Sequence, residues 1–111
     1  MAEVRTEFGS IFKAISTRAN KAKFGNVFFA TQITLIGDLD YLPLYVKVED
    51  KVPEVAPYEY IGANFYIDAD AATLAQVLNG KLSIYDAIDS RMVKVNGEAG
   101  PAAIFISKVL D

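Results

Sequence analysis

The side chains that could carry chemistry in this chain are carboxylates, because its 111 residues include neither histidine nor cysteine. Histidine is the usual general base near neutral pH and the commonest metal ligand. Zinc sites and nucleophilic dyads or triads depend on His and Cys side chains in the same way. The composition therefore excludes these classes of catalytic and metal site, along with any disulfide.

The acidic residues form three close pairs, which are Asp38 with Asp40, Asp68 with Asp70, and Asp86 with Asp89. The first pair lies in an expected loop that lacks the further ligands of a calcium site. In the second pair, either residue can cap a helix. The third pair fits the solvated face of a short helix. No pair has the apolar surroundings that raise the pKa of a general acid. We therefore expect no catalytic residue, no metal and no cofactor, and a protein that is not an enzyme.

Net charge and apolar content limit the partners. The net charge of −3 is the wrong sign for binding nucleic acid through its phosphates. The apolar run Val27–Ala30 is far shorter than a membrane span, and Glu3, Arg5 and Glu7 do not suit a signal peptide. We expect one cytoplasmic domain over residues 1–111. The hydrophobic fraction of 52% is high for a small domain, which indicates either a ligand cavity or an oligomer interface.

The first two thirds of the chain predict one helix and three strands. Phe8, Ile11, Phe12 and Ile15 follow the i, i+3, i+4, i+7 pattern of an amphipathic helix over residues 2–20. Alternating or β-rich stretches predict strands at 27–36, 44–49 and 58–67. The stretch 52–57 contains two prolines, so it is either a loop or an edge strand.

From residue 68 the hydrophobic period becomes helical. A helix is expected from Asp68 or Asp70 to Gly80, and Ser83 opens a second, shorter one. A short strand over 92–96 closes at Gly97, and Gly100-Pro101 opens the last helix. The order α-β-β-β-α-α-β-α predicts an α+β fold. Its sheet is expected to be largely antiparallel, with about five strands and with helices on one face.

Residues 70–97 resemble the second half of the sterol-carrier-protein-2-like family. The resemblance lies in Asp70-x-x-Thr73-Leu74-x-x-Val77-Leu78-x-Gly80-Lys81-Leu82, then Ala87, then Val93-Lys94-Val95-x-Gly97. One position departs from the pattern, because the family commonly has Gly where this chain has Ser90-Arg91. The resemblance implies an apolar tunnel between sheet and helices. It also implies non-covalent binding and transfer of fatty acyl chains, sterol-like or isoprenoid lipids.

Eleven apolar residues are the candidate lining of that cavity. They are Phe8, Phe12, Phe29, Ile33, Leu44, Val46, Phe65, Leu74, Leu78, Ile88 and Phe105. A lipid needs apolar area of this kind and few polar anchors. The same residues could equally fill one another as an ordinary core.

Two surface features concern partners other than lipid. Tyr45, Tyr58, Tyr60 and Tyr66 are expected on one solvent-facing side of the sheet. They could form a homodimer or partner surface, or could simply be good strand residues that pair across strands. This surface is the basis of an alternative function, a module of the same fold that binds no lipid.

Arg18, Lys21 and Lys23 could contact an anionic membrane surface transiently, or could complement the end of the first helix.

Overall fold

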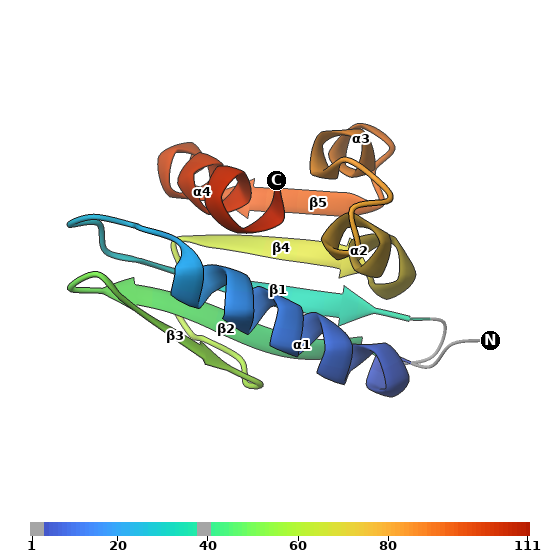
Figure 1. Ribbon diagram of the computed structural model, residues 1–111, viewed down its shortest axis with the longest axis horizontal. Helices are drawn as coiled ribbons and strands as arrows, with labels where there is room; N and C mark the ends of the chain where they lie inside the picture. Colours follow the sequence, from blue (N-terminus) through green and yellow to red (C-terminus); the bar gives the residue numbers. More distant parts are fainter. Residues whose placement is uncertain (1–3, 38–40) are drawn as a thin grey trace.

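The fold is a five-stranded sheet with helices packed on one face (Figure 1). The structure is a computed structural model that describes residues 4–37 and 41–111. The elements in chain order are α1 (Val4–Lys21), β1 (Phe29–Ile36), β2 (Tyr41–Glu49), β3 (Val52–Ala56), β4 (Phe65–Asp70), α2 (Ala71–Leu78), α3 (Ile84–Asp89), β5 (Val93–Gly97), α4 (Ala99–Phe105) and the π-helix η1 (Ile106–Leu110).

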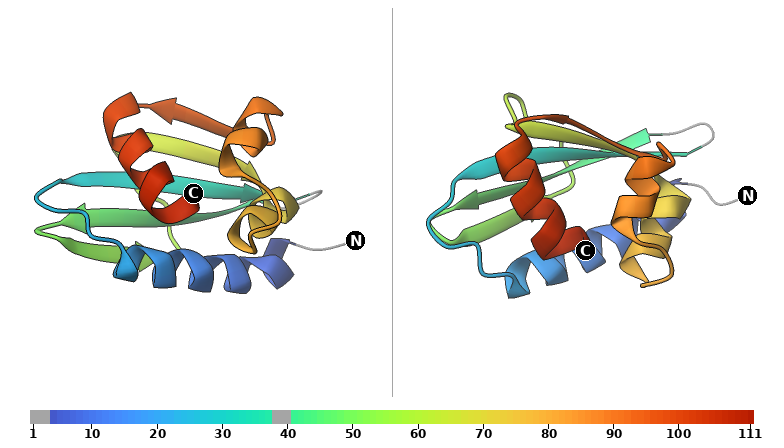
Figure 2. Two further views of the ribbon diagram at one scale, coloured as in Figure 1. Left: turned by 45° about the horizontal axis from the view of Figure 1, so that its top comes forward. Right: turned by 90° about the horizontal axis from the view of Figure 1, so that it is seen from above.

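The strand order is β3-β2-β1-β4-β5, and every neighbouring pair except β1 and β4 is antiparallel. The sheet is therefore mixed but largely antiparallel, as the sequence predicts. In the two views of Figure 2 the helices gather on one side of the strands. The opposite side, called the open face below, carries alternate strand residues such as Gln32, Tyr45 and Tyr66.

Alternation along the strands places one set of apolar side chains under the helices. In β1, Phe29, Ile33 and Leu35 are buried, as expected from the sequence. Helix α1 meets this layer through Ile11 and Ile15, both at most 1% exposed. Consecutive buried positions four apart on α1 keep its apolar stripe on the sheet.

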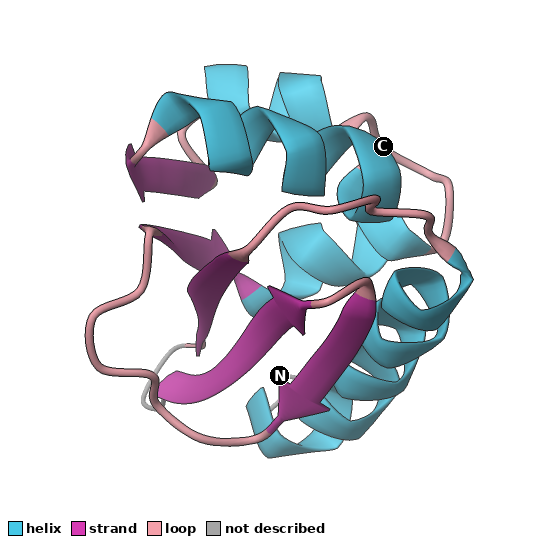
Figure 3. Cartoon of the chain, turned by 90° about the vertical axis from the view of Figure 1, so that its left-hand side faces the viewer, coloured by secondary structure: helices cyan, strands magenta, loops and turns pink. Residues whose placement is uncertain are grey.

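The connection from β3 to β4 differs from the prediction. The expected strand over 58–67 begins only at Phe65, and residues 57–64 form a loop. In Figure 3 this loop passes around the sheet on the side away from the helices. Ile61, which falls within this expected strand, is 96% exposed. The reason is topological. Since β3 lies at one edge and β4 pairs with β1 on the far side of β2, the chain must cross one face of the sheet. The helices cover the other face, so the loop crosses the open face.

The proline-containing stretch 52–57, expected to be either a loop or an edge strand, forms the edge strand β3. It pairs with β2 from Val52 to Ala56. Asp50 and Lys51 form the connecting turn with φ of 51° and 69°, the positive values of a two-residue hairpin turn. The prolines are compatible with this position because β3 lies at the sheet edge.

Asn64 joins the starts of β1 and β4 to the start of α4. Its Oδ1 accepts from the Ala30 N–H at 2.9 Å, and its own N–H donates to the Ala30 carbonyl at 2.8 Å. Its Nδ2 donates to Glu98 Oε2 at 3.0 Å, and the Glu98 N–H donates back to the Asn64 carbonyl at 3.0 Å. These four bonds fix three segments that are distant in sequence at one corner of the fold.

Short helices begin and end largely where the sequence predicts. Asp70 caps α2 by accepting from the Thr73 N–H at 3.0 Å, and Ser83 caps α3 through Tyr85. After α3, Arg91 has φ of +66°, so a non-glycine residue occupies a left-handed position. This is the position at which the sequence departs from the family pattern. No helix in the described part of the chain is long and apolar enough to span a membrane.

Gly97 is expected to be essential to the β4–β5 edge. Its φ is +125°, and an added Cβ would lie 2.6 Å from both the Asn64 oxygen and the Phe65 Cα. Gly97→Ala should lower the free energy of unfolding by about 3 kcal/mol in urea denaturation. Gly100→Ala is the matched control, because a Cβ there meets nothing within 4 Å and the residue is helical. That variant should be neutral or more stable, and equal losses in both would contradict this account.

Arg91→Gly should stabilise the protein. Glycine removes a left-handed strain of about 1 kcal/mol, so thermal unfolding should shift upward by a few degrees. Ser90→Gly is the control, because Ser90 has φ of −81° and a hydroxyl that donates to the Ala87 carbonyl at 3.0 Å. It should destabilise. A lower melting temperature for Arg91→Gly would show that the arginine side chain contributes more than its backbone conformation costs.

Candidate ligand-binding site

Four phenylalanines meet between the sheet and the helices. Phe29 lies at the centre, with ring centroids 5.7 Å from Phe24, 5.9 Å from Phe65 and 6.2 Å from Phe105. Phe65 and Phe105 are 5.9 Å apart. Edge and tilted contacts at these spacings are favourable for aromatic rings. The cluster joins β1, β4 and α4 and forms the apolar centre of the candidate site.

The eleven candidate lining residues all belong to this layer. Seven are buried, namely Phe29, Ile33, Leu44, Val46, Phe65, Leu74 and Phe105. Phe8, Phe12, Leu78 and Ile88 are half-buried and pack against them. The side chains form one packed cluster, and the tunnel expected between the layers stays a prediction. Phe24, which is not among the eleven candidates, also joins the cluster through its edge contact with Phe29.

An apolar groove opens beside the cluster, between β5, α3 and α4. Its volume is about 340 Å³, and it is lined by Tyr85, Val95, Gly97, Ala99, Ala102, Ala103 and Ile106. The four residues from α4 and η1 have the spacing i, i+3, i+4, i+7, so one helical stripe builds one wall. Three of these four are alanines, whose small side chains leave the groove open. The spacing of these four residues can be recognised in the sequence. They were not predicted as lining because the candidates were all large apolar side chains.

One lining residue of the groove, Tyr85, carries a polar group and contacts a carboxylate. The Tyr85 hydroxyl donates to Asp111 Oδ2 at 3.3 Å. Desolvation, followed by the negative charge and the hydrogen bond of Asp111, raises the pKa of Tyr85. None of the lining residues carries a charge, so the groove suits an apolar, uncharged group.

Arg18 of α1 joins the ends of two other helices. Its Nη1 donates to the Val109 carbonyl at 2.9 Å, and its Nη2 donates to the Leu78 carbonyl at 2.8 Å. The guanidinium group thus donates hydrogen bonds to the last turns of α2 and η1. Carbonyls there lack helical partners, and positive charge is favourable at a helix C-terminus. Of the basic cluster suggested for membrane contact, Arg18 is therefore engaged inside the fold. Lys21 and Lys23 are exposed.

Tyr45 and Tyr66 lie on the open face, and much of the contact that the tyrosines make is internal. The Tyr45 and Tyr60 rings are 5.2 Å apart, and the Tyr66 hydroxyl accepts from the Ala63 N–H at 3.2 Å. The Tyr60 N–H donates to Gln32 Oε1 at 3.0 Å. These contacts fasten the crossing loop to the sheet. Tyr58 and Tyr60 lie in this loop and not in a strand, which corrects the sequence assignment. Tyr58 is 66% exposed, and an interface through it stays a prediction.

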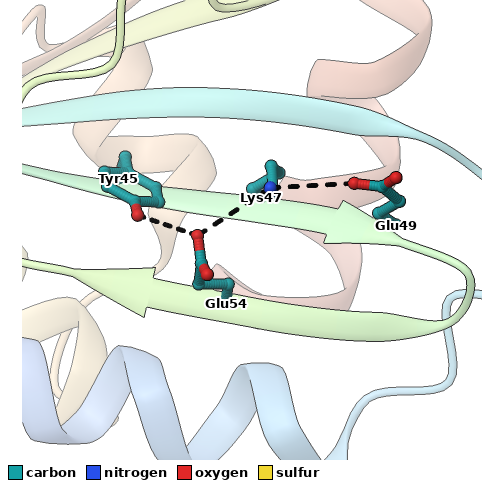
Figure 4. Close-up of polar contacts among 4 residues, drawn as sticks. All are labelled: Tyr45, Lys47, Glu49 and Glu54. Carbon is teal, nitrogen blue, oxygen red and sulfur yellow. Dashed lines mark hydrogen bonds and ion pairs between the residues drawn. The ribbon is translucent and has the colours of Figure 1, made fainter.

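Charged residues flank this tyrosine group. Tyr45 donates to Glu54 Oε2 at 2.8 Å, and Lys47 Nζ lies 3.9 Å from the same oxygen and 3.7 Å from Glu49 Oε2 (Figure 4). The hydrogen bond to Glu54, with smaller contributions from burial and charge, raises the pKa of Tyr45. Exposed pairs of this kind contribute little to stability.

The acidic pairs do not converge. Asp38 and Asp40 lie outside the described residues. Asp70 caps α2, and Asp68 faces the open side of β4 opposite Lys94. Among the residues that the structure describes, no three carboxylates come together as a metal site would require.

The fold matches solved structures of sterol carrier proteins. Sterol carrier protein 2-like 2 from Aedes aegypti gives a TM-score of 0.76 at 14% identity, covering 91% of this chain and 94% of that one. The palmitated Aedes aegypti protein gives 0.71 at 13% identity, covering 99% and 96%. An inverting sec-alkylsulfatase from a Pseudomonas species gives 0.56 at 13% identity, covering 90% of this chain but 14% of the enzyme.

Comparison of sequences adds no relative. No protein-family model matches the chain, and no curated protein matches it significantly. The likeness therefore rests on three-dimensional structure, over almost the whole chain. On that ground, this protein has the sterol-carrier-protein-2-like fold.

Proposed function

We propose that this protein binds and carries an apolar ligand between its sheet and its helices, with the groove beside α4 as the entry. The observation that carries the proposal is the contiguity of an open apolar groove with a buried aromatic cluster. Gly97 and Ile106 line the groove, while their neighbours Phe65 and Phe105 belong to the cluster. An acyl, sterol-like or isoprenoid chain that enters the groove is one layer of side chains from the interior.

The side of α4 that faces the groove presents small side chains. The start of the helix is fixed by the bonds between Glu98 and Asn64, but Ala99, Gly100 and Ala103 are exposed. Small side chains bury little apolar area, so a shift of the alanine side of this wall costs less than a shift of a leucine-lined one. Burial of the ligand's own chain, at about 25 cal/mol per Å², would offset that cost.

The proposed action is non-catalytic. The solved structure of a palmitated relative supports an acyl chain as one ligand, because that protein shares the fold over nearly its full length. The alkylsulfatase shows that the fold also occurs as a small part of an enzyme. In the present chain the groove lining offers one hydroxyl and no carboxylate, amine or imidazole, which supports binding over chemistry.

Ligand carriage is tested by native mass spectrometry of gently purified protein, followed by extraction and identification of any bound molecule. A co-purifying lipid is the expected result. In parallel, titration with the neutral dye Nile red should give saturable fluorescence enhancement. A bare protein mass together with no dye binding would contradict the carrier function and favour the interaction module.

The entry is tested by Ala103→Trp, which places a large ring in the groove at an exposed helical position. We expect Nile red affinity to fall roughly tenfold or more, with little change in melting temperature. Ala72→Trp is the matched control, because Ala72 is an exposed alanine on α2 that does not line the groove. Equal dye affinity in both variants would place the entry elsewhere.

A further inference from the structure

One polar atom in the interior has no partner. Thr31 is 0% exposed and lies on the helix-facing side of β1, the central strand. Its hydroxyl oxygen has no hydrogen-bond partner. Among the described residues it is the single buried residue that is polar, and the others are all hydrophobic. A buried hydroxyl without a partner is costly, so an apolar residue of the same shape would be the more stable choice for a core alone.

Thr31 lies on a direct line from the groove. In the sheet register, Thr31 is opposite Phe65 on β4, and Phe65 is opposite Gly97 on β5. Gly97 lines the groove. With strands spaced about 4.8 Å apart, the threonine is roughly 10 Å inward from the groove wall. Phe65 lies between them in the register, with its ring against that of Phe105, and a ligand would have to displace these rings.

We infer that Thr31 is the polar anchor of the binding site, and that the preferred ligand is an uncharged lipid bearing a hydroxyl or carbonyl oxygen. This inference rests on the proposed carrier function. The oxygen would pair with the orphan threonine hydroxyl, and the hydrocarbon would extend past Phe65 toward Gly97 and the groove. A hydroxyl head group supplies the missing hydrogen bond at no cost in buried charge.

The same surroundings disfavour an ionised head group. A carboxylate placed beside Thr31 would lose its hydration among Phe29, Ile33 and Val46, with no cation in this buried set to compensate it. The Asp111 carboxylate, which is hydrogen-bonded to the lining residue Tyr85, would repel an anion. Free fatty acids should therefore bind with the head group outside, or less tightly than the corresponding alcohols.

The test compares 1-dodecanol, 1-chlorododecane and dodecanoate as competitors for Nile red, on the wild type, Thr31→Val and Thr31→Ser. The wild type should bind dodecanol roughly 5- to 30-fold more tightly than chlorododecane, and more tightly than dodecanoate. Thr31→Val should abolish the preference for dodecanol over chlorododecane, while Thr31→Ser, which keeps the hydroxyl, should retain it. The ligand-free valine variant should melt at or above the wild-type temperature.

Each contrary result has a distinct meaning. Equal affinity of the wild type for dodecanol and chlorododecane, or a preference that survives in Thr31→Val, would overturn the anchor and leave the carrier function standing. A valine variant that melts well below the wild type would show that the hydroxyl has an internal partner, which also overturns the anchor. Failure of the wild type to bind the dye or any competitor would overturn the carrier function and this inference together.

Discussion

The fold depends on the hydrogen-bonded corner that Asn64 makes with Ala30 and Glu98. It fixes where β4 begins beside β1 and where α4 begins after β5. Phe29 and Phe65 directly adjoin this corner in sequence, and Phe105 is on the helix that starts there. The hydrogen bonds of Asn64 with Ala30 and Glu98 therefore position the segments whose rings meet at the centre of the core. The absence of a side chain at Gly97 is part of this arrangement, since any Cβ would meet the same Asn64 carbonyl.

The elements on the two sides of the apolar interior are held by different interactions. The strands are held by their pairing, and the Arg18 guanidinium group joins α1 to the ends of α2 and η1. The wall beside the groove consists instead of alanines on α4 and the wider turns of η1, with Ile106 as its largest lining residue. Under the proposed carrier function, a ligand that enters beside these alanines would leave the strand register unchanged.

Much of this architecture could be predicted from local patterns. Helix α1, the alternation in β1 and β2, and the Asp70 cap each depend on residues close in sequence, so period and capping chemistry suffice. The crossing loop could not be predicted, because Tyr58 to Ala63 alternates like a strand while the topology requires a passage over the open face. The site was predicted only in part. Large buried residues were identified, whereas the alanine wall and the orphan hydroxyl of Thr31 depend on which elements pack together.

The two edges of the sheet differ in how they resist the addition of another strand. On β3, the two-residue turn leaves the backbone of Pro53 facing outward, and proline has no N–H to offer. On β5, the bonds from Asp70 to Met92 and from Glu98 to Asn64 leave the backbone groups of Val93, Val95 and Gly97 facing outward, and no described strand pairs with them. Self-association through strand exchange or fibril growth, where it occurs, should begin at β5. Lys94 is the one charge within that strand that opposes it.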